Sequence, residues 1–148
     1  MVIVVDLDGT LTIVGERIKY LKQDPPDWAA FYSRCGEDRP NAPVLQLIHA
    51  LLSISNRYEI VFCTGRPEEY RKPTADWLEQ WAFTSGDYQL LMRADGDHRS
   101  DSIVKPESLK HAGFRKDNVE FILEDRSSMV EAWRKLGFAC FQVAEGLY

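Results

Sequence analysis

The stretch VIVVDLDGT, residues 2–10, decides how this chain is to be understood. The apolar, mostly β-branched residues Val2–Val5 predict a buried strand. Asp6 and Asp8 follow it directly, and Gly9 behind them permits a tight turn. Two carboxylates this close repel each other, which disfavours their charged forms. The stretch therefore predicts a site at the end of a strand, with a chemistry that involves a metal ion or a phosphate group.

Length and composition are those of one compact domain, 1–148. The chain has 148 residues, 45% of them hydrophobic and 28% charged, which is ordinary for a soluble globular protein. No apolar run is long enough for a membrane span, so no membrane partner is expected. The apolar start lacks a basic leader and ends in charge, which favours the cytoplasm. The net charge of −5 argues against nonspecific binding of duplex nucleic acid but allows a small basic pocket.

Strand and helix patterns alternate along most of the chain. Strands are predicted at Val2–Val5, Tyr58–Cys63, Tyr88–Met92, Val119–Leu123 and Phe138–Val143. Helices are predicted at Ala42–Ser55, Pro73–Phe83, Pro106–Ala112 and Ser127–Leu136, the last capped by Ser127. The strands are continuously apolar rather than alternating, which indicates a Rossmann-like parallel sheet with helices on both faces. Such α/β folds place their sites at the carboxyl ends of the strands.

The segment Thr12–Asn41 departs from this alternation. It is polar, contains three prolines, and has one predicted short helix, Asp27–Ser33. We interpret it as a minimal cap, an insertion that lies over the site. Trp28 and Tyr32 in this insertion have two interpretations: they stack on a nucleobase, or they pack against the insertion's own loops, which we favour.

Polar residues gather at the predicted strand ends. Asp6 and Asp8 follow the first strand, Thr64-Gly65-Arg66 the second, and Glu124-Asp125-Arg126 the fourth, while Lys105 precedes the short third helix. These residue types suit phosphoryl transfer. One carboxylate can take the phosphoryl group, a second can exchange protons, and a hydroxyl and an ammonium can hold the phosphoryl oxygens. Further carboxylates can bind Mg²⁺, which prefers oxygen ligands.

The order of these motifs resembles a known family. DLDGT (6–10), TGR (64–66), Lys105 and ED (124–125) are similar to the four motifs of the haloacid dehalogenase superfamily of phosphatases. Within it, the closer resemblance is to the phosphatase domain of phage polynucleotide kinase/phosphatase. That resemblance includes CTGR (63–66), DHRSDSIVK (97–105), Arg17, and the tail from Glu124 to Tyr148.

The resemblance implies roles for individual residues. Asp6 is the expected nucleophile and Asp8 the expected general acid and base. The expected Mg²⁺ ligands are Asp6, the backbone carbonyl of Asp8, and Asp125, with Glu124 beside them. Thr64 and Lys105 are expected to hold the phosphoryl oxygens. The residues expected on the substrate side are Arg17, Gly65, Arg66, Arg99 and Asp101.

Three positions depart from the family pattern: Thr64 stands in place of a serine, and Glu124 and Ser102 each stand in place of an aspartate. None removes a catalytic part. For Arg17, Arg99 and Asp101, a structural ion pair is the alternative interpretation. A cysteine phosphatase built on Cys63 is excluded, because that chemistry needs an arginine six residues later and Glu69 stands there.

The expected function is a Mg²⁺-dependent phosphatase that removes 3′-phosphates from the ends of DNA or RNA, with a separate kinase or ligase as a candidate partner. One alternative is a phosphatase for a nucleotide or another small molecule. An alternative of another class is a non-catalytic domain that binds nucleic-acid ends. The intact catalytic motifs argue against this alternative.

Overall fold

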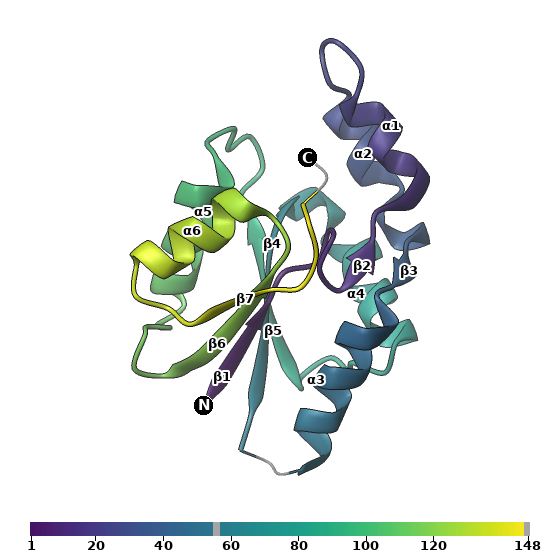
Figure 1. The fold of residues 1–148 in the computed structure, drawn as a ribbon. Coiled ribbons are helices and arrows are strands. Elements are labelled where there is room, and N and C mark those ends of the chain that lie inside the picture. The colour runs from purple at the N-terminus through teal and green to yellow at the C-terminus, as the bar shows by residue number, and fades with distance from the viewer. Residues whose placement is uncertain (55–56, 147–148) are drawn as a thin grey trace.

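The computed structural model describes residues 1–54 and 57–146, which form a five-stranded parallel sheet with helices on both faces (Figure 1). The strand order is β5-β4-β1-β6-β7. The strands are β1 (Val2–Val5), β4 (Glu59–Pro67), β5 (Tyr88–Arg93), β6 (Val119–Glu124) and β7 (Cys140–Gln142). The predicted Rossmann-like α/β architecture is therefore confirmed.

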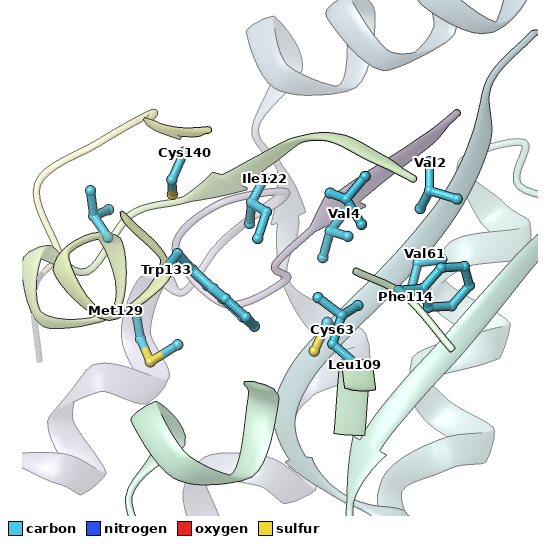
Figure 2. Packing of buried hydrophobic residues seen from close by; sticks show 12 residues of the cluster. Val2, Val4, Val61, Cys63, Leu109, Phe114, Ile122, Met129, Trp133 and Cys140 are labelled. Atoms are coloured by element: carbon cyan, nitrogen blue, oxygen red, sulfur yellow. The ribbon is translucent and has the colours of Figure 1, made fainter. Parts of the chain in front are cut away.

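The alternation of side chains along β1 divides the core into two. Ile3 and Val5 pack on one face with Ile48 of α3 (Ala42–Ile54) and Trp77 of α4 (Arg71–Gln80). Val2 and Val4 face the other way, toward α5 (Asp101–His111) and α6 (Ser127–Lys135). Figure 2 shows this second cluster, in which Leu109 of α5 and Trp133 of α6 lie against the strands. Both faces of β1 are thus covered, which explains its unbroken apolar sequence.

The insertion begins and ends at a small second sheet. Its strands, β2 (Thr12–Ile13) and β3 (Arg39–Pro40), pair antiparallel. Between them come η1 (Gly15–Arg17), α1 (Ile18–Leu21), α2 (Trp28–Ser33) and η2 (Cys35–Glu37). In Figure 1, α1 and α2 stand together beyond the carboxyl ends of the main strands. The predicted helix at Asp27–Ser33 is confirmed, and Asp27 caps it by accepting a 2.9 Å hydrogen bond from the backbone N–H of Ala30. The short helix α1 was not predicted.

Several predicted boundaries were wrong. The third helix, α5, begins at Asp101 rather than Pro106, and Pro106 lies inside it. The backbone carbonyl of Ser100 accepts from the N–H groups of Ile103 and Val104 at 3.0 and 3.1 Å, which fixes the start of the helix. Proline favours the first turn of a helix, which misplaced the predicted start.

The remaining differences have local causes. Helix α4 begins at Arg71 and ends at Gln80, because Ala82 adopts a left-handed conformation (φ 65°) and turns the chain back. Strand β4 runs on to Pro67, while β7 is shorter than predicted and pairs only with the end of β6. Ser127 is not a cap, because it is the first residue of α6 and makes no side-chain capping bond. The predicted last residue of the α3 helix, Ser55, lies outside the described residues.

None of the helices that the structure describes combines the length and the apolar character needed to cross a bilayer. The cysteines Cys35, Cys63 and Cys140 are buried free thiols. Burial raises the pKa of Cys63 to about 12 and that of Cys140 to about 11, so these thiols stay protonated near neutral pH.

Candidate active site

A cavity of about 780 Å³ lies at the carboxyl ends of the strands. The ends of β1 and β4 contribute Asp6, Asp8, Thr64 and Gly65 to its lining, and α5 contributes Lys105. Helix α2 of the insertion, the 96–100 loop and the first turn of α5 form further parts of the wall. Residues from distant parts of the sequence therefore meet where the strand-end argument predicted.

Lys105 joins two buried carboxylates. Its Nζ lies 2.6 Å from Oδ1 of Asp6 and 2.9 Å from Oε2 of Glu124. Burial alone would lower the pKa of Lys105, but the charges of Asp6 and Glu124 hold it well above its ordinary value, so the ammonium stays charged. Burial, together with the charge of Glu124, raises the pKa of Asp6 well above its ordinary value despite the opposing effect of Lys105. The longer side chain of Glu124, compared with the expected aspartate, is the one that reaches Lys105.

Asp6, Glu124 and Asp125 form a buried acidic cluster in which one ligand atom from each lies within 4.8 Å of the others. Burial and the charge of Glu124 raise the pKa of Asp125 to about 6. Three carboxylates thus face the single ammonium of Lys105, and negative charge remains to be offset. An all-oxygen donor set with excess negative charge fits Mg²⁺.

Gly9 lets this cluster form. Its φ is +90°, a conformation that side-chain-bearing residues rarely adopt, and a Cβ there would lie 2.2 Å from Oδ2 of Asp125. Thr10, next in the turn, donates a 3.2 Å hydrogen bond from its hydroxyl to Oδ1 of Asp125. The glycine of the DLDGT motif is therefore required by the close approach of a carboxylate.

Asp8 is held by two buried guanidinium groups. Arg66 donates from Nε to both carboxylate oxygens at 3.1 Å and from Nη2 to Oδ1 at 2.6 Å, and Arg17 pairs with the same carboxylate. Burial alone would raise the pKa of Asp8, but the charges of Arg66 and Arg17 hold it well below its ordinary value. Neither arginine is among the residues that line the cavity. Their placement indicates support for Asp8, and direct contact with substrate stays a prediction.

The sequence did not predict that Asp38 pairs with Arg17. Asp38 accepts a 2.8 Å hydrogen bond from Nε of Arg17 and a 3.0 Å bond from the hydroxyl of Thr12. The indole N–H of Trp77 donates to the Asp38 carbonyl at 2.8 Å. Asp38 precedes β3 in no recognisable motif, and only the fold brings it beside Arg17.

Asp101 pairs with two further arginines, Arg93 and Arg126; the sequence placed Arg126 at the strand ends without a role and did not indicate Arg93. Arg93 also donates a 3.1 Å hydrogen bond from Nε to the carbonyl of Gly65. A Cβ at Gly65 would lie 2.7 Å from Oδ1 of Asp101, so only glycine fits there. Asp101 lines the cavity, yet its contacts mainly hold the 64–66 segment in place.

Arg99 lies at the cavity in a more exposed position. Its Nη2 is 2.8 Å from Oδ2 of Asp97 and its Nη1 is 3.0 Å from Oε2 of Glu107, while 51% of its side chain is exposed. These pairs are accessible to solvent and weak, so the guanidinium can exchange them for a ligand phosphate.

The aromatic residues of α2 also line the cavity. Tyr32 donates a 3.4 Å hydrogen bond to the carbonyl of Gly65, which agrees with the packing interpretation for this residue. Trp28, in contrast, remains 48% exposed.

Comparisons with known proteins identify the family to which this chain is similar. The family model of the polynucleotide kinase PNKP phosphatase domain matches residues 1–148. A protein of Autographa californica nuclear polyhedrosis virus, named as a bifunctional polynucleotide kinase/RNA ligase, is 28% identical over 131 residues, which are 88% of this chain and 17% of that protein.

Solved structures show the same relationship. Chains in two structures of the Pnkp1/Rnl/Hen1 complex, one described as an RNA repair complex, superpose with TM-scores of 0.79 and 0.80 at 32% and 33% identity. Each match covers 99% of this chain and 43% or 46% of the other, so this chain spans less than half of those relatives.

The HAD domain of the effector protein Lem4 from Legionella pneumophila superposes with a TM-score of 0.54 over 99% of this chain and 88% of that one; at 14% identity it shares the fold alone. The family match over the whole chain, together with the motifs gathered at the strand ends, shows that this chain belongs to the phosphatase-domain family of polynucleotide kinase PNKP, of the haloacid dehalogenase (HAD) type.

Proposed function

We propose that this domain removes phosphate from the 3′ ends of nucleic acids through an aspartyl-phosphate formed on Asp6. The observation that supports this best is the position of Asp6, which lies at the cavity wall between the ammonium of Lys105 and the carboxylate of Asp125. The ionised carboxylate of Asp6 can attack a phosphorus atom while the neighbouring ammonium stabilises the phosphoryl oxygens, and a cation bound between Asp6 and Asp125 would favour that ionised form against the burial that raises its pKa.

The first step forms a bond between an Asp6 oxygen and phosphorus and breaks the bond from phosphorus to the 3′ oxygen. Lys105 and the hydroxyl of Thr64 hold the phosphoryl oxygens, and Asp8 gives a proton to the departing 3′ oxygen. The charges of Arg66 and Arg17 hold the pKa of Asp8 below its ordinary value, which favours the ionised carboxylate in the absence of substrate. A bound phosphate adds negative charge beside Asp8, which raises its pKa and favours uptake of a proton from solvent water; Asp8 then passes this proton to the departing 3′ oxygen.

The second step releases inorganic phosphate. Asp8, ionised again after the first step, takes a proton from water, and the water oxygen attacks phosphorus as the bond to Asp6 breaks. The pairing with Arg66 and Arg17 favours the ionised form that this step needs.

We further propose that Asp6, Asp125 and the backbone carbonyl of Asp8 hold Mg²⁺, with Glu124 beside it. The bound ion would neutralise negative charge on the phosphoryl oxygens. Glu124 also holds Lys105 in position through their 2.9 Å contact, a role that it would keep in metal-free protein.

The substrate proposal draws on the cavity and on the relatives. A volume of about 780 Å³ exceeds the needs of a phosphate group and falls in the range of sites for larger ligands. The relatives carry names that refer to polynucleotide kinase, RNA ligase and an RNA repair complex. A kinase or ligase, on the same or another chain, is the partner we propose.

Rates of phosphate release from matched oligonucleotides test this function. DNA and RNA of one sequence are prepared with a 3′-phosphate or a 5′-phosphate and compared with 3′- and 5′-mononucleotides in Mg²⁺. We expect the fastest release from 3′-phosphate ends and none with the matched variant Asp6→Asn. Preference for 5′ ends would contradict the 3′ assignment, preference for mononucleotides would favour a nucleotide phosphatase, and turnover by Asp6→Asn would exclude Asp6 as nucleophile.

A further inference from the structure

An aromatic series leads outward from the phosphate-binding end of the cavity. The Tyr32 ring stacks on that of Trp28, with centroids 5.9 Å apart and planes 25° from parallel. The Tyr32 ring also contacts the ring of Tyr70, and the two ring centroids are 5.7 Å apart. All three rings line the cavity.

Tyr32 fixes this series relative to the site. Its hydroxyl donates to the carbonyl of Gly65, the residue after Thr64. Burial, with the charges of Asp8 and Asp101, raises the pKa of Tyr32 above its ordinary value, so the hydroxyl keeps the proton that it donates. Trp28 is one helical turn earlier, and its distance from the reacting groups is therefore set by the Tyr32–Gly65 contact.

Packing of the insertion accounts for some of these aromatic residues and not for others. Phe31 is buried, with 1% of its surface exposed, and its ring contacts the rings of Trp28 and Tyr32 in edge-to-face geometry. Trp28 leaves 48% of its surface exposed although it borders the cavity. A large aromatic ring at the mouth of a cavity offers apolar surface that a ligand can cover.

The wall contains both acidic and basic side chains, and Arg99 is an accessible basic group among them. Arg99, whose side chain is 51% exposed, belongs to the 96–100 loop that lines the same cavity. A terminal nucleotide whose phosphate reaches Asp6 presents a flat base on one side of its sugar and the next phosphodiester on the other. An aromatic ring and a guanidinium group match those two parts.

We infer that Trp28, supported by Tyr32, is the stacking platform for the nucleobase of the terminal nucleotide. This inference rests on the proposed function and adds the contact by which a nucleoside 3′-phosphate is favoured over a phosphomonoester that lacks a base. Stacking tolerates every base, because each presents a flat π face, so the platform provides affinity without sequence preference.

A double-mutant cycle between protein and substrate tests it. One 3′-phosphorylated oligonucleotide ends in thymidine and its partner ends in an abasic tetrahydrofuran residue. The value of kcat/KM is measured for the unaltered protein, Trp28→Ala, Trp28→Phe and the control Phe141→Ala. Phe141 lies on β7, outside the cavity lining, and is 56% exposed, so it matches Trp28 in exposure.

We expect the unaltered protein to prefer the thymidine end by about 5- to 150-fold, the usual effect of one base–aromatic stack. Trp28→Ala should lose this preference by slowing only on the thymidine end. Trp28→Phe should keep most of it, and Phe141→Ala all of it.

Two results would overturn the inference while the proposed function stands: equal rates of the unaltered protein on both ends, or equal losses on both ends in Trp28→Ala. The second would mean that Trp28 only holds the insertion in place. No release from any 3′-phosphate end by the unaltered protein would instead refute the proposed function, and the inference with it.

Discussion

Two glycines of the site lie so close to a carboxylate that a side chain would have no room. Gly9 lies beside Asp125 and Gly65 lies beside Asp101. Each contact joins the end of a strand to a charged group from elsewhere in the chain. The spacing of the charges, and with it their mutual effect on pKa, therefore depends on the absence of a side chain at both glycines and on the left-handed backbone of Gly9.

Replacing Gly9 by alanine should impair the metal site beyond its effect on stability. The matched control is Gly113→Ala, because Gly113 has a similar φ of +87° but a Cβ added there would meet nothing within 4 Å. Both variants should lose about 1–2 kcal/mol of unfolding free energy from backbone strain. Only Gly9→Ala, which pushes Asp125 aside, should also raise the Mg²⁺ concentration for half-maximal activity. Equal Mg²⁺ requirements in the two variants would contradict this reasoning.

Asp101 should stabilise the fold in a pH-dependent manner. Burial alone would raise its pKa, but Lys105, Arg126 and Arg93 hold that pKa below its ordinary value. The carboxylate therefore contributes stability above the pKa of the unfolded chain, about 3.9, and loses it as pH falls through the folded pKa. Urea unfolding should show Asp101→Asn less stable at pH 7 by about 1.5–3 kcal/mol, with a gap that closes below about pH 4.

The control for this measurement is Asp76→Asn. Asp76 pairs with Lys72 at 2.7 Å on an exposed face of α4, where an ion pair contributes little. If the difference in unfolding free energy between the unaltered protein and Asp101→Asn did not depend on pH, the stabilisation would come from the shape of the Asp101 side chain and not from its charge.

At the scale of elements, α5 carries Lys105 into the site although a proline follows it directly. Pro106 has no N–H for the carbonyl of Ser102, four residues earlier, and its ring crowds that carbonyl. Ser102 is exposed, so water can reach the carbonyl oxygen. The helix thus tolerates the proline at a cost in stability. The proline directly follows Lys105, the residue that α5 places in the site.

Pro106→Ala should therefore stabilise the protein. The added N–H and the lost clash should raise the unfolding free energy by about 2 kcal/mol, after allowance for the greater entropy of the unfolded chain. Thermal unfolding measures the gain, and Glu107→Ala, one residue on in the same helix, is the control. A lower melting temperature in Pro106→Ala would mean that the ring packs in a way that offsets its helix-breaking effect.

At the scale of the molecule, the sequence predicted the sheet and the edge at which the site forms. Continuous apolar runs identify strands buried on both faces, and parallel strands place their carboxyl ends together. Asp38, Arg93 and the pairing of Arg126 with Asp101 were not predicted, because the sequence around a charged residue in a loop or at a strand end does not identify its partner in the folded chain. The start of α5 was missed because a local preference of proline was outweighed by the backbone bonds at Ser100.

Mg²⁺ should stabilise the whole molecule as well as activate it, because the acidic cluster is repulsive without a cation. Binding at 100 times the dissociation constant would add about 2.7 kcal/mol. Melting temperature should rise with Mg²⁺ in the unaltered protein and respond much less in Asp125→Asn, and EDTA should abolish activity until Mg²⁺ is restored. Full activity in EDTA, or an equal thermal response in Asp125→Asn, would contradict the metal assignment.

The pairing of Thr12 with Pro40 brings the two ends of the insertion side by side. A segment with adjacent ends can change in length at small entropic cost, about 0.6 kcal/mol for each doubling. Natural variation or a designed graft can therefore exchange the 18–36 stretch, and with it the aromatic platform, without rebuilding the sheet. Arg17 and Asp38 flank that stretch and support Asp8, and Arg17 donates a 3.3 Å hydrogen bond to the carbonyl of Phe31, so a replacement must supply an acceptor at that position.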